Sequence, residues 1–218
     1  MRLSPDAFNN FLATSVRQNA VWRRAFACPC VSPSSGMADM NCPFCGSLGW
    51  QWAPGENVHT GMQALRPATA KAMFGVWDDG DAMLTIPSNV PLYEAGLYDR
   101  IMLSDATTRF SVNITPGVNE RLRGKIVSID RVCWIADGVL VQGDAPEVSD
   151  VGILTWPNGE PPEDATVSIS GVKHVELFLA KDIPNSRNSG ITGLPRKVAA
   201  RRFDILGRAG TDPTQPIS

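Results

Sequence analysis

Residues 125–141 read Lys-Ile-Val-Ser-Ile-Asp-Arg-Val-Cys-Trp-Ile-Ala-Asp-Gly-Val-Leu-Val. Strand-forming residues stand on both sides of Asp137-Gly138, a dipeptide typical of a two-residue hairpin turn. The segment therefore predicts short strands over 125–129, 131–135 and 139–141. Alternating apolar and polar residues predict further strands over 109–114 and 174–179. Four more apolar runs are interpreted as strands, namely 82–86, 100–103, 153–155 and 166–170.

The composition also favours many short strands. Among 218 residues there are 19 Gly and 17 Pro, which interrupt long helices and supply turns. Hydrophobic residues make up 43% and charged residues 19%, so neither a disordered chain nor a fibre is indicated. A formal charge of −2 names no partner by itself. We predict a mainly β chain that folds as a barrel or a sandwich.

A helix is predicted near the N-terminus, within residues 1–26. Ser4 suits the N-cap, Pro5 the first helical position, and Asp6 the positive end of the helix dipole. An apolar stripe at near-helical spacing continues towards Trp22 and comprises Phe8, Phe11, Leu12, Val16 and Ala20. We expect this stripe to pack against the core or, alternatively, to dock onto another subunit.

The most specific motif lies within residues 28–50. Cys28-Pro-Cys30 is followed, after eleven residues, by Cys42-Pro-Phe-Cys45-Gly-Ser-Leu-Gly-Trp50. Zinc prefers four ligands in a tetrahedron, and each closely spaced pair can supply two thiolates from one tight turn. Glycines at 46 and 49 permit the positive φ angles that let backbone N–H groups reach sulfur. One structural zinc ion is therefore predicted, with four metal ligands: Cys28, Cys30, Cys42 and Cys45.

Three other uses of these cysteines stay open. A redox pair would need Cys42 and Cys45 at the start of a helix, which the nearby glycines disfavour. Two disulfides across the pairs would form after loss of the metal or in an oxidising medium. An iron–sulfur cluster also takes four thiolates, although these spacings match none of the common ones.

Charge is distributed unevenly along the chain. The segment 139–165 has six acids and no Lys or Arg; the acids are Asp144, Glu147, Asp150, Glu160, Glu163 and Asp164. The tail 183–208 is basic, with Arg187, Arg196, Lys197, Arg201, Arg202 and Arg208 against one acid. The two segments are expected to meet within a subunit or between neighbouring subunits, with a DNA-facing tail as the alternative.

No recognised catalytic motif surrounds either histidine, so we expect no enzyme. Cys133 stands among strand formers and is predicted to be a buried core residue. The acids at 78, 79 and 81 predict a solvated turn, because they lack the spacing of a calcium loop. No secretion signal and no run of eighteen apolar residues is apparent, so the chain is expected in the cytoplasm, with reduced cysteines and no membrane partner.

These features predict four segments. They are an N-terminal helix in 1–26, a zinc-binding loop with four cysteines in 27–56, a β-barrel or β-sandwich body in 57–182, and an extended basic C-terminal arm in 183–218. The arm is rich in Pro, Gly, Asn and Arg, a composition that orders against a partner.

Several motifs together resemble virion neck proteins of tailed bacteriophages. The resemblance covers most of the chain and rests on the two cysteine pairs and on the stretches Gly117-Val-Asn-Glu-Arg121, Ile129-Asp-Arg-Val-Cys-Trp134, Leu154-Thr-Trp-Pro-Asn-Gly-Glu-Pro-Pro162 and Leu194-Pro-Arg-Lys-Val-Ala-Ala-Arg-Arg-Phe-Asp-Ile-Leu-Gly-Arg208.

The resemblance implies a head-to-tail connector of the adaptor or stopper kind. Such a protein is a β-barrel with extensions that forms a homo-oligomeric ring around the DNA channel, between the portal and the tail proteins. It would reside in the virion neck and, during assembly, in the host cytoplasm. Arg121, Arg123 and Arg131 would be candidates for facing neighbouring subunits or, without sequence specificity, the channel DNA. A zinc-ribbon nucleic-acid-binding regulator is the alternative, although the cysteine loop itself has no Lys or Arg.

Overall fold

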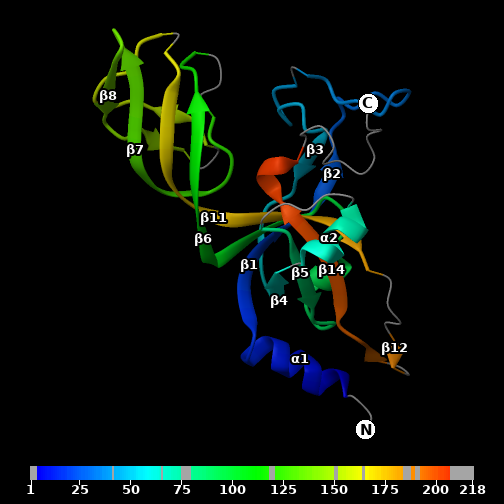
Figure 1. Cartoon of the computed structure of the whole chain (residues 1–218). Helices are drawn as coiled ribbons and strands as arrows, with labels where there is room; N and C mark the ends of the chain where they lie inside the picture. The colour runs from blue at the N-terminus through cyan, green and yellow to red at the C-terminus, as the bar shows by residue number, and fades with distance from the viewer. Residues whose placement is uncertain are drawn as a thin grey trace. The chain divides into compact units, whose positions relative to one another are not determined.

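The structure, a computed structural model, describes residues 4–40, 42–64, 66–74, 80–117, 121–149, 152–163, 165–183, 188–189 and 192–206. It is mainly β, as predicted, with an N-terminal helix and a large antiparallel sheet (Figure 1). The chain divides into two compact units, with residues 1–105 and 176–218 in unit 1 and residues 106–175 in unit 2. Within the described ranges, no helix has the length and apolar character needed to cross a membrane.

Six strands of unit 1 close into a barrel. The sheet order runs β14-β5-β4-β1-β6-β11, and β11 also pairs with β14, so each of the six has two neighbours. A closed ring leaves no unpaired edge. The strands are β1 (Arg17–Arg23), β4 (Glu56–Ala64), β5 (Ala82–Ile86), β6 (Arg100–Ile114), β11 (Val167–Asp182) and β14 (Arg196–Arg202).

The barrel interior follows from strand alternation. In β5 every second residue is buried, which places Leu84 and Ile86 inside while the residues between them are partly exposed. Ile101 and Leu103 of β6 and Val198 of β14 are likewise fully buried. Aliphatic side chains that alternate along paired strands therefore form the core of unit 1.

The N-terminal helix α1 (Pro5–Thr14) begins as predicted, with Ser4 Oγ accepting from the backbone N–H of Ala7 at 3.5 Å. The predicted continuation of its apolar stripe is wrong. The helix ends at Thr14, and β1 begins at Arg17 with Ala20 and Trp22 buried in alternation. A spacing of four residues, as between Val16 and Ala20, fits one face of a strand as well as one face of a helix, so the pattern did not distinguish them.

The predicted C-terminal arm is also wrong for its described part. β14 pairs with β5 and with β11, and its residues Val198, Ala199 and Ala200 are completely buried. It is therefore a central barrel strand. The predicted body at 57–182 is correspondingly incomplete, because β1 and β14 lie outside it yet close the ring. Residues 184–187, 190–191 and 207–218 of the arm lie outside the described residues.

The arginines of this strand have nearby acidic partners. Arg196 binds Asp182 at 3.2 Å, Arg201 binds Asp81 at 3.3 Å, and Arg202 binds Asp204 at 2.5 Å. The predicted solvated turn at Asp81 is thus wrong at that residue, which is buried and ion-paired. Asp78 and Asp79 lie outside the described residues.

Unit 2 is a four-stranded sheet in the order β6-β11-β7-β8, with β7 at Ile126–Ala136 and β8 at Val139–Gly143. The predicted hairpin turn is confirmed, because Ala136 pairs with Val139 and both Asp137 and Gly138 have the positive φ angles of a type I′ turn. β7 is one strand where two were predicted. The segment between β8 and β11 packs on one face of this sheet and carries β9 (Glu147–Val148) and β10 (Leu154–Thr155).

The remaining elements are short and belong to unit 1. They are β2 (Ala25–Ala27), β3 (Trp50–Trp52), β12 (Asn188–Ser189), β13 (Thr192–Gly193), α2 (Pro67–Phe74) and the 3-10 helices η1 (Pro91–Glu94) and η2 (Phe203–Ile205).

Candidate metal centre

A two-stranded ribbon brings the two cysteine pairs together. β2 pairs with β3 in antiparallel register, from Ala25 opposite Trp52 to Ala27 opposite Trp50. Cys28 directly follows β2, and its backbone N–H donates to the carbonyl of Gly49 at 2.8 Å. Cys28 and Cys30 therefore follow the end of β2, and Cys42 and Cys45 precede the start of β3, at the same end of the ribbon.

Each pair is formed by a tight turn. The backbone N–H of Val31 donates to the Cys28 carbonyl at 3.0 Å, and that of Gly46 donates to the Cys42 carbonyl at 3.0 Å. Gly46 and Gly49 have φ angles of 57° and 74°, as the sequence predicted. Ser47 also adopts a positive φ of 66°, which the sequence did not indicate. These turns direct all four thiols to one point.

The four sulfur atoms lie within 4.8 Å of one another. Cys28 Sγ is 3.8 Å from Cys42 Sγ, and Cys30 Sγ is 3.5 Å from Cys45 Sγ. Because a disulfide requires about 2.05 Å, neither of these pairs is bonded. The structure thus brings the four predicted ligands together in a cluster that can hold a metal ion, and metal binding itself stays a prediction.

Hydrogen bonds to sulfur surround the cluster. The backbone N–H of Gly49 donates to Cys45 Sγ at 3.3 Å, and Gln51 Nε2 donates to Cys28 Sγ at 3.4 Å. Donors of this kind orient metal-bound thiolates and stabilise their charge. Gly49 was anticipated in this role, whereas Gln51 was not, although its place directly after the motif is a usable signal.

The four thiols are not equally acidic. Desolvation raises the pKa of Cys30 to about 12 and also raises the pKa of Cys45. The backbone N–H of Cys45 instead lowers the pKa of Cys42 to about 7. Four thiolates in so small a space repel one another, so full deprotonation requires a cation at the centre.

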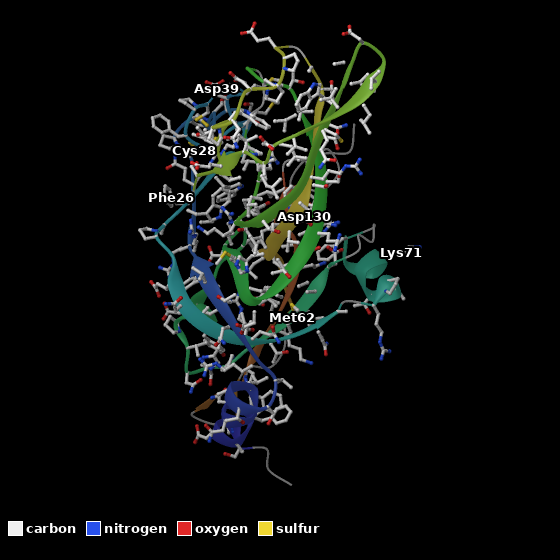
Figure 2. The ribbon with its side chains drawn as sticks, turned by 90° about the vertical axis from the view of Figure 1, so that its left-hand side faces the viewer. Phe26, Cys28, Asp39, Met62, Lys71 and Asp130 are labelled. Atoms are coloured by element: carbon white, nitrogen blue, oxygen red, sulfur yellow. The ribbon has the colours of Figure 1, made fainter. Side chains whose placement is uncertain are left out.

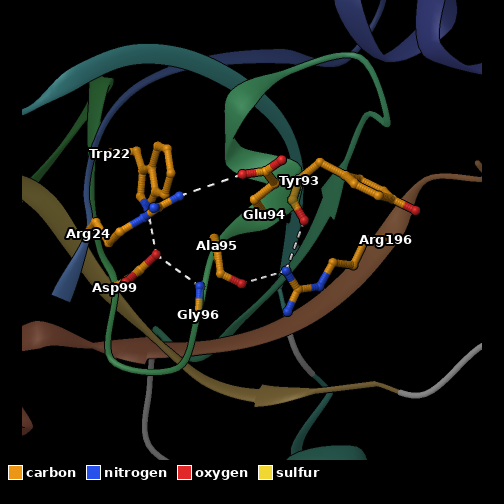
Figure 3. Close-up of polar contacts among 8 residues, drawn as sticks. All are labelled: Trp22, Arg24, Tyr93, Glu94, Ala95, Gly96, Asp99 and Arg196. Carbon is orange, nitrogen blue, oxygen red and sulfur yellow. Dashed lines mark hydrogen bonds and ion pairs between the residues drawn. The ribbon is translucent and has the colours of Figure 1, made fainter. Parts of the chain in front are cut away.

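The base of the ribbon is anchored to the barrel through Asp99 (Figure 3). Its buried carboxylate accepts from Ala25 N at 2.7 Å, Trp22 Nε1 at 2.8 Å and Gly96 N at 2.9 Å. Three N–H donors satisfy the charge that burial would otherwise penalise. One carboxylate thereby connects β1, the start of β2 and the turn after η1.

Arg196 holds the other side of that turn. Its Nη1 donates to the carbonyls of Tyr93 at 3.0 Å and Ala95 at 2.5 Å (Figure 3). Exposed Arg24 and Glu94 approach to 3.8 Å nearby, a contact that water screens strongly. The turn that leads to Asp99 is therefore fixed by hydrogen bonds from the Arg196 side chain, on a strand more than a hundred residues away from Tyr93 and Ala95, to the backbone carbonyls of the turn.

Aromatic packing supports the second ribbon strand. Trp50 stacks on Tyr98 with ring centroids 4.3 Å apart, and Trp52 Nε1 donates to the Tyr98 carbonyl at 3.1 Å. Tyr98 has a φ of 68°, which is costly for a residue with a side chain. Its backbone N–H donates to Leu179 of β11 at 2.8 Å, and this bond helps hold that conformation.

Other predicted candidates lie elsewhere. Cys133 is half-buried on β7 of unit 2, so the prediction of a buried core residue is wrong. Val132 points into the unit 2 core, and Cys133, the next residue on β7, lies on the opposite face of the strand. The segment between β6 and β7 carries Arg121 and Arg123, and Arg121 forms an isolated β-bridge with Ile153. Arg131 is exposed on β7.

Comparison with models of known protein families and with curated proteins finds no match to this chain.

Proposed function

We propose that the four cysteines bind one structural zinc ion. Four sulfurs at about 2.3 Å from zinc in a tetrahedron stand about 3.8 Å apart. The cluster has separations of 3.5 Å and 3.8 Å, and all of its sulfurs lie within 4.8 Å. An iron–sulfur cluster places several atoms between its thiolates and spreads them further. The separations therefore support a single tetrahedral ion.

The proposed role of the ion is structural. Four protein thiolates complete a tetrahedron and leave no position for a substrate or an activated water. Among the described residues of the loop, the cysteines cluster with Val31, and Leu48 packs instead against the core of unit 1, so the loop has no apolar core of its own. Zinc binding energy then serves as folding energy for residues 28–49.

Zinc content tests this role directly. Protein purified without chelator is expected to contain about one zinc per chain by elemental analysis. Cys28→Ser should lose the ion, because three thiolates hold it more weakly. Cys133→Ser, which removes a thiol outside the cluster, is the matched control and should keep it. A folded wild-type protein with five titratable thiols and no metal would contradict the proposal.

We further propose that the chain is a non-catalytic virion protein of a tailed bacteriophage, forming a homo-oligomeric ring in the neck. The ring would join the portal, or an adaptor bound to it, to the tail around the DNA channel. The sequence motifs that resemble neck proteins support this proposal, and so does the closed barrel, which is the fold that the resemblance implied. Contact with channel DNA would be non-specific.

The observation that carries the docking role is the surface of the cysteine loop. Its large apolar side chains face solvent: Phe26 is 47% exposed, Phe44 79% and Met40 83%. Figure 2 labels Phe26 and Cys28 on this ribbon. Large apolar side chains exposed on one short segment are typical of a protein–protein contact. The zinc loop would thus present an interface to the portal or the tail.

Electron microscopy of the intact particle tests the neck assignment. We expect this chain in a ring between the portal and the tail, with the cysteine loops at a boundary to a neighbouring protein. Finding the chain elsewhere, or in no particle, would contradict it. A monomer that binds duplex DNA with strong salt dependence would instead favour the nucleic-acid-binding regulator.

A further inference from the structure

An open groove crosses the sheet of unit 2. It has a volume of about 550 Å³ and is lined by Arg109 and Ser111 of β6, Asp130 and Arg131 of β7, and Ser170 and Gly171 of β11. Phe110 also lines it, and two guanidinium groups and two hydroxyls supply hydrogen-bond donors beside that ring and the Asp130 carboxylate. Its chemistry suits a carboxylate or another oxyanion.

A β-bulge shapes this groove. Arg131 pairs with Ser170 and Ile129 pairs with Gly171, so Asp130 is an extra residue on β7. Gly171 is required there, since a Cβ at this position would stand 2.1 Å from the Ser128 carbonyl oxygen. Asp130 Oδ1 accepts from Ser128 Oγ at 3.0 Å. The bulge re-aims the β7 side chains and leaves Asp130 and Arg131 side by side in the groove (Figure 2 labels Asp130).

The two arginines of the groove are exposed, and the described residues provide no ion pair for either. The described arginines of the tail differ, because Arg196, Arg201 and Arg202 already bind Asp182, Asp81 and Asp204. The acidic segment was expected to meet that tail. Within one chain, its described acids therefore do not pair with the described arginines of that tail.

Those acids lie on the other side of unit 2. Val132 and Ile169 point into a core that Val148, Leu154 and Trp156 of the acidic segment cover. The neighbouring residues Arg131 and Ser170 alternate to the opposite face. The described acids of the segment are all exposed and have no ion pair within the described structure: they are Asp144, Glu147, Glu160 and Glu163. One sheet thus separates the packed residues of the acidic segment, Val148, Leu154 and Trp156, from the arginine groove.

We propose that the arginine groove of one copy binds the acidic segment of the next copy. Opposite charges on opposite faces of one unit cannot neutralise each other within a chain, but they fit head to tail between chains. A head-to-tail contact whose rotation closes produces a ring. Arginine binds carboxylates with two parallel hydrogen bonds, which also fixes orientation. The inference rests on the proposed ring and names the contact that builds it.

Protein acids fit the groove better than DNA phosphates do. Residues 106–175 contain nine Asp or Glu and six Lys or Arg, so this unit repels a polyanion at long range. Asp130 within the groove adds a local negative charge. A DNA duplex carries one negative charge per about 1.7 Å, so it would be repelled by the net charge of the unit and by Asp130. A short acidic segment can place one or two carboxylates on the arginines and avoid Asp130.

Charge reversal on purified full-length chain tests the contact, read out by sedimentation and mass photometry. Arg109→Glu/Arg131→Glu should weaken self-association at least about tenfold, because it sets like charges against each other. Glu160→Lys/Glu163→Lys or Asp144→Lys/Glu147→Lys should do the same. Arg66→Glu/Lys71→Glu is the matched control, since both side chains are exposed in unit 1 and neither has an ion pair with another described residue (Figure 2 labels Lys71).

Mixing the variants gives the decisive result. The groove variant keeps a normal acidic segment, and each acid variant keeps a normal groove, so an equimolar mixture with at least one acid variant should restore association. Wild-type association should also weaken as salt rises from about 50 mM to about 300 mM.

Three results would overturn the groove contact: rings unaffected by groove reversal, no restoration in either mixture, or a wild-type chain that never self-associates. Loss of duplex binding by the groove variant with unchanged association would show a phosphate site and also overturn it. Rings that ignore groove reversal would leave the proposed neck ring standing, whereas microscopy of the particle decides that ring independently.

Discussion

The barrel of unit 1 and the cysteine loop that interrupts it are stabilised by different forces. The barrel buries aliphatic side chains completely, among them Leu84, Ile101 and Val198. In the described part of the loop between β2 and β3, the thiols cluster with Val31, Leu48 reaches the core of unit 1, and Met40 and Phe44 are exposed. Burial of apolar surface holds the first region, whereas we propose that a metal ion bound by the four thiols holds the second. The two regions should therefore respond to different perturbations.

Removing the metal should produce the largest separation between them. Structural zinc in small cysteine sites contributes on the order of 10–16 kcal/mol of apparent binding energy, so its loss should unfold the loop. Hydrogen exchange should show that the amides of Gly46 and Gly49 lose protection after chelation, while those of β5 and β6 keep it. Unchanged protection in the loop would contradict the comparison, and loss throughout the barrel would show that the two regions fold as one.

A cavity in the barrel should give the opposite pattern. Leu84→Ala removes a completely buried side chain and should lower the free energy of unfolding by about 2–5 kcal/mol. Zinc content should stay at about one per chain, because the cysteines are untouched. Ile135→Ala is the control, since that side chain is 71% exposed, and should change stability by less than about 0.5 kcal/mol. Chemical denaturation and elemental analysis on the same samples provide both measurements.

Asp99 links the two regions, so its loss should affect both. Asp99→Ala leaves the donors of Trp22 and Ala25 buried without an acceptor and should cost about 1–3 kcal/mol. Zinc should also become easier to remove by a competing chelator. Glu94→Ala, close in sequence but with a side chain 81% exposed, should change neither quantity. Equal effects of the two substitutions would remove Asp99 from its anchoring role.

Two glycines of the loop provide the finest test. Gly49 and Gly36 have similar positive φ angles of 74° and 69°, so Ala at either costs about 1 kcal/mol in the backbone. A Cβ on Gly49 would meet Ala38 and Val31 in ordinary contact at 3.4 Å, and one on Gly36 meets nothing within 4 Å. Gly49 differs because its N–H donates to Cys45 Sγ and its carbonyl accepts from Cys28 N, so backbone strain there is passed to the ligands. Gly49→Ala should therefore lower zinc affinity several-fold more than Gly36→Ala in a chelator titration. Equal losses would mean that backbone conformation alone sets the affinity.

Local signals in the sequence predicted what local interactions determine. The cysteine spacing identified the four clustered thiols, and Asp137-Gly138 identified a turn that needs two positive φ angles. Both depend on residues within a few positions of one another. The mainly β class also followed from many short apolar runs, each of which reports on its own strand.

Long-range partners defeated the remaining predictions. Arg196 and Arg201 looked like an exposed basic arm because the acids that pair with them, Asp182 and Asp81, are not their sequence neighbours. Asp99 looked ordinary for the same reason, since two of the three N–H groups it accepts from, those of Trp22 and Ala25, lie more than seventy residues earlier. A charged residue inside a barrel has no local signature, because its burial depends on which distant strand supplies the counter-charge.

The order of strands around the barrel constrains how the chain is made. β5 at Ala82–Ile86 and β11 find their common neighbour only when β14 at Arg196–Arg202 has emerged from the ribosome. Unit 2 is continuous in sequence and can complete its own pairings earlier. Domains generally fold as they are synthesised, and pairings between distant segments form slowly. The barrel thus stays open during most of translation, and the edges of β5 and, until β11 emerges, of β6 are the place where a chaperone would be needed most.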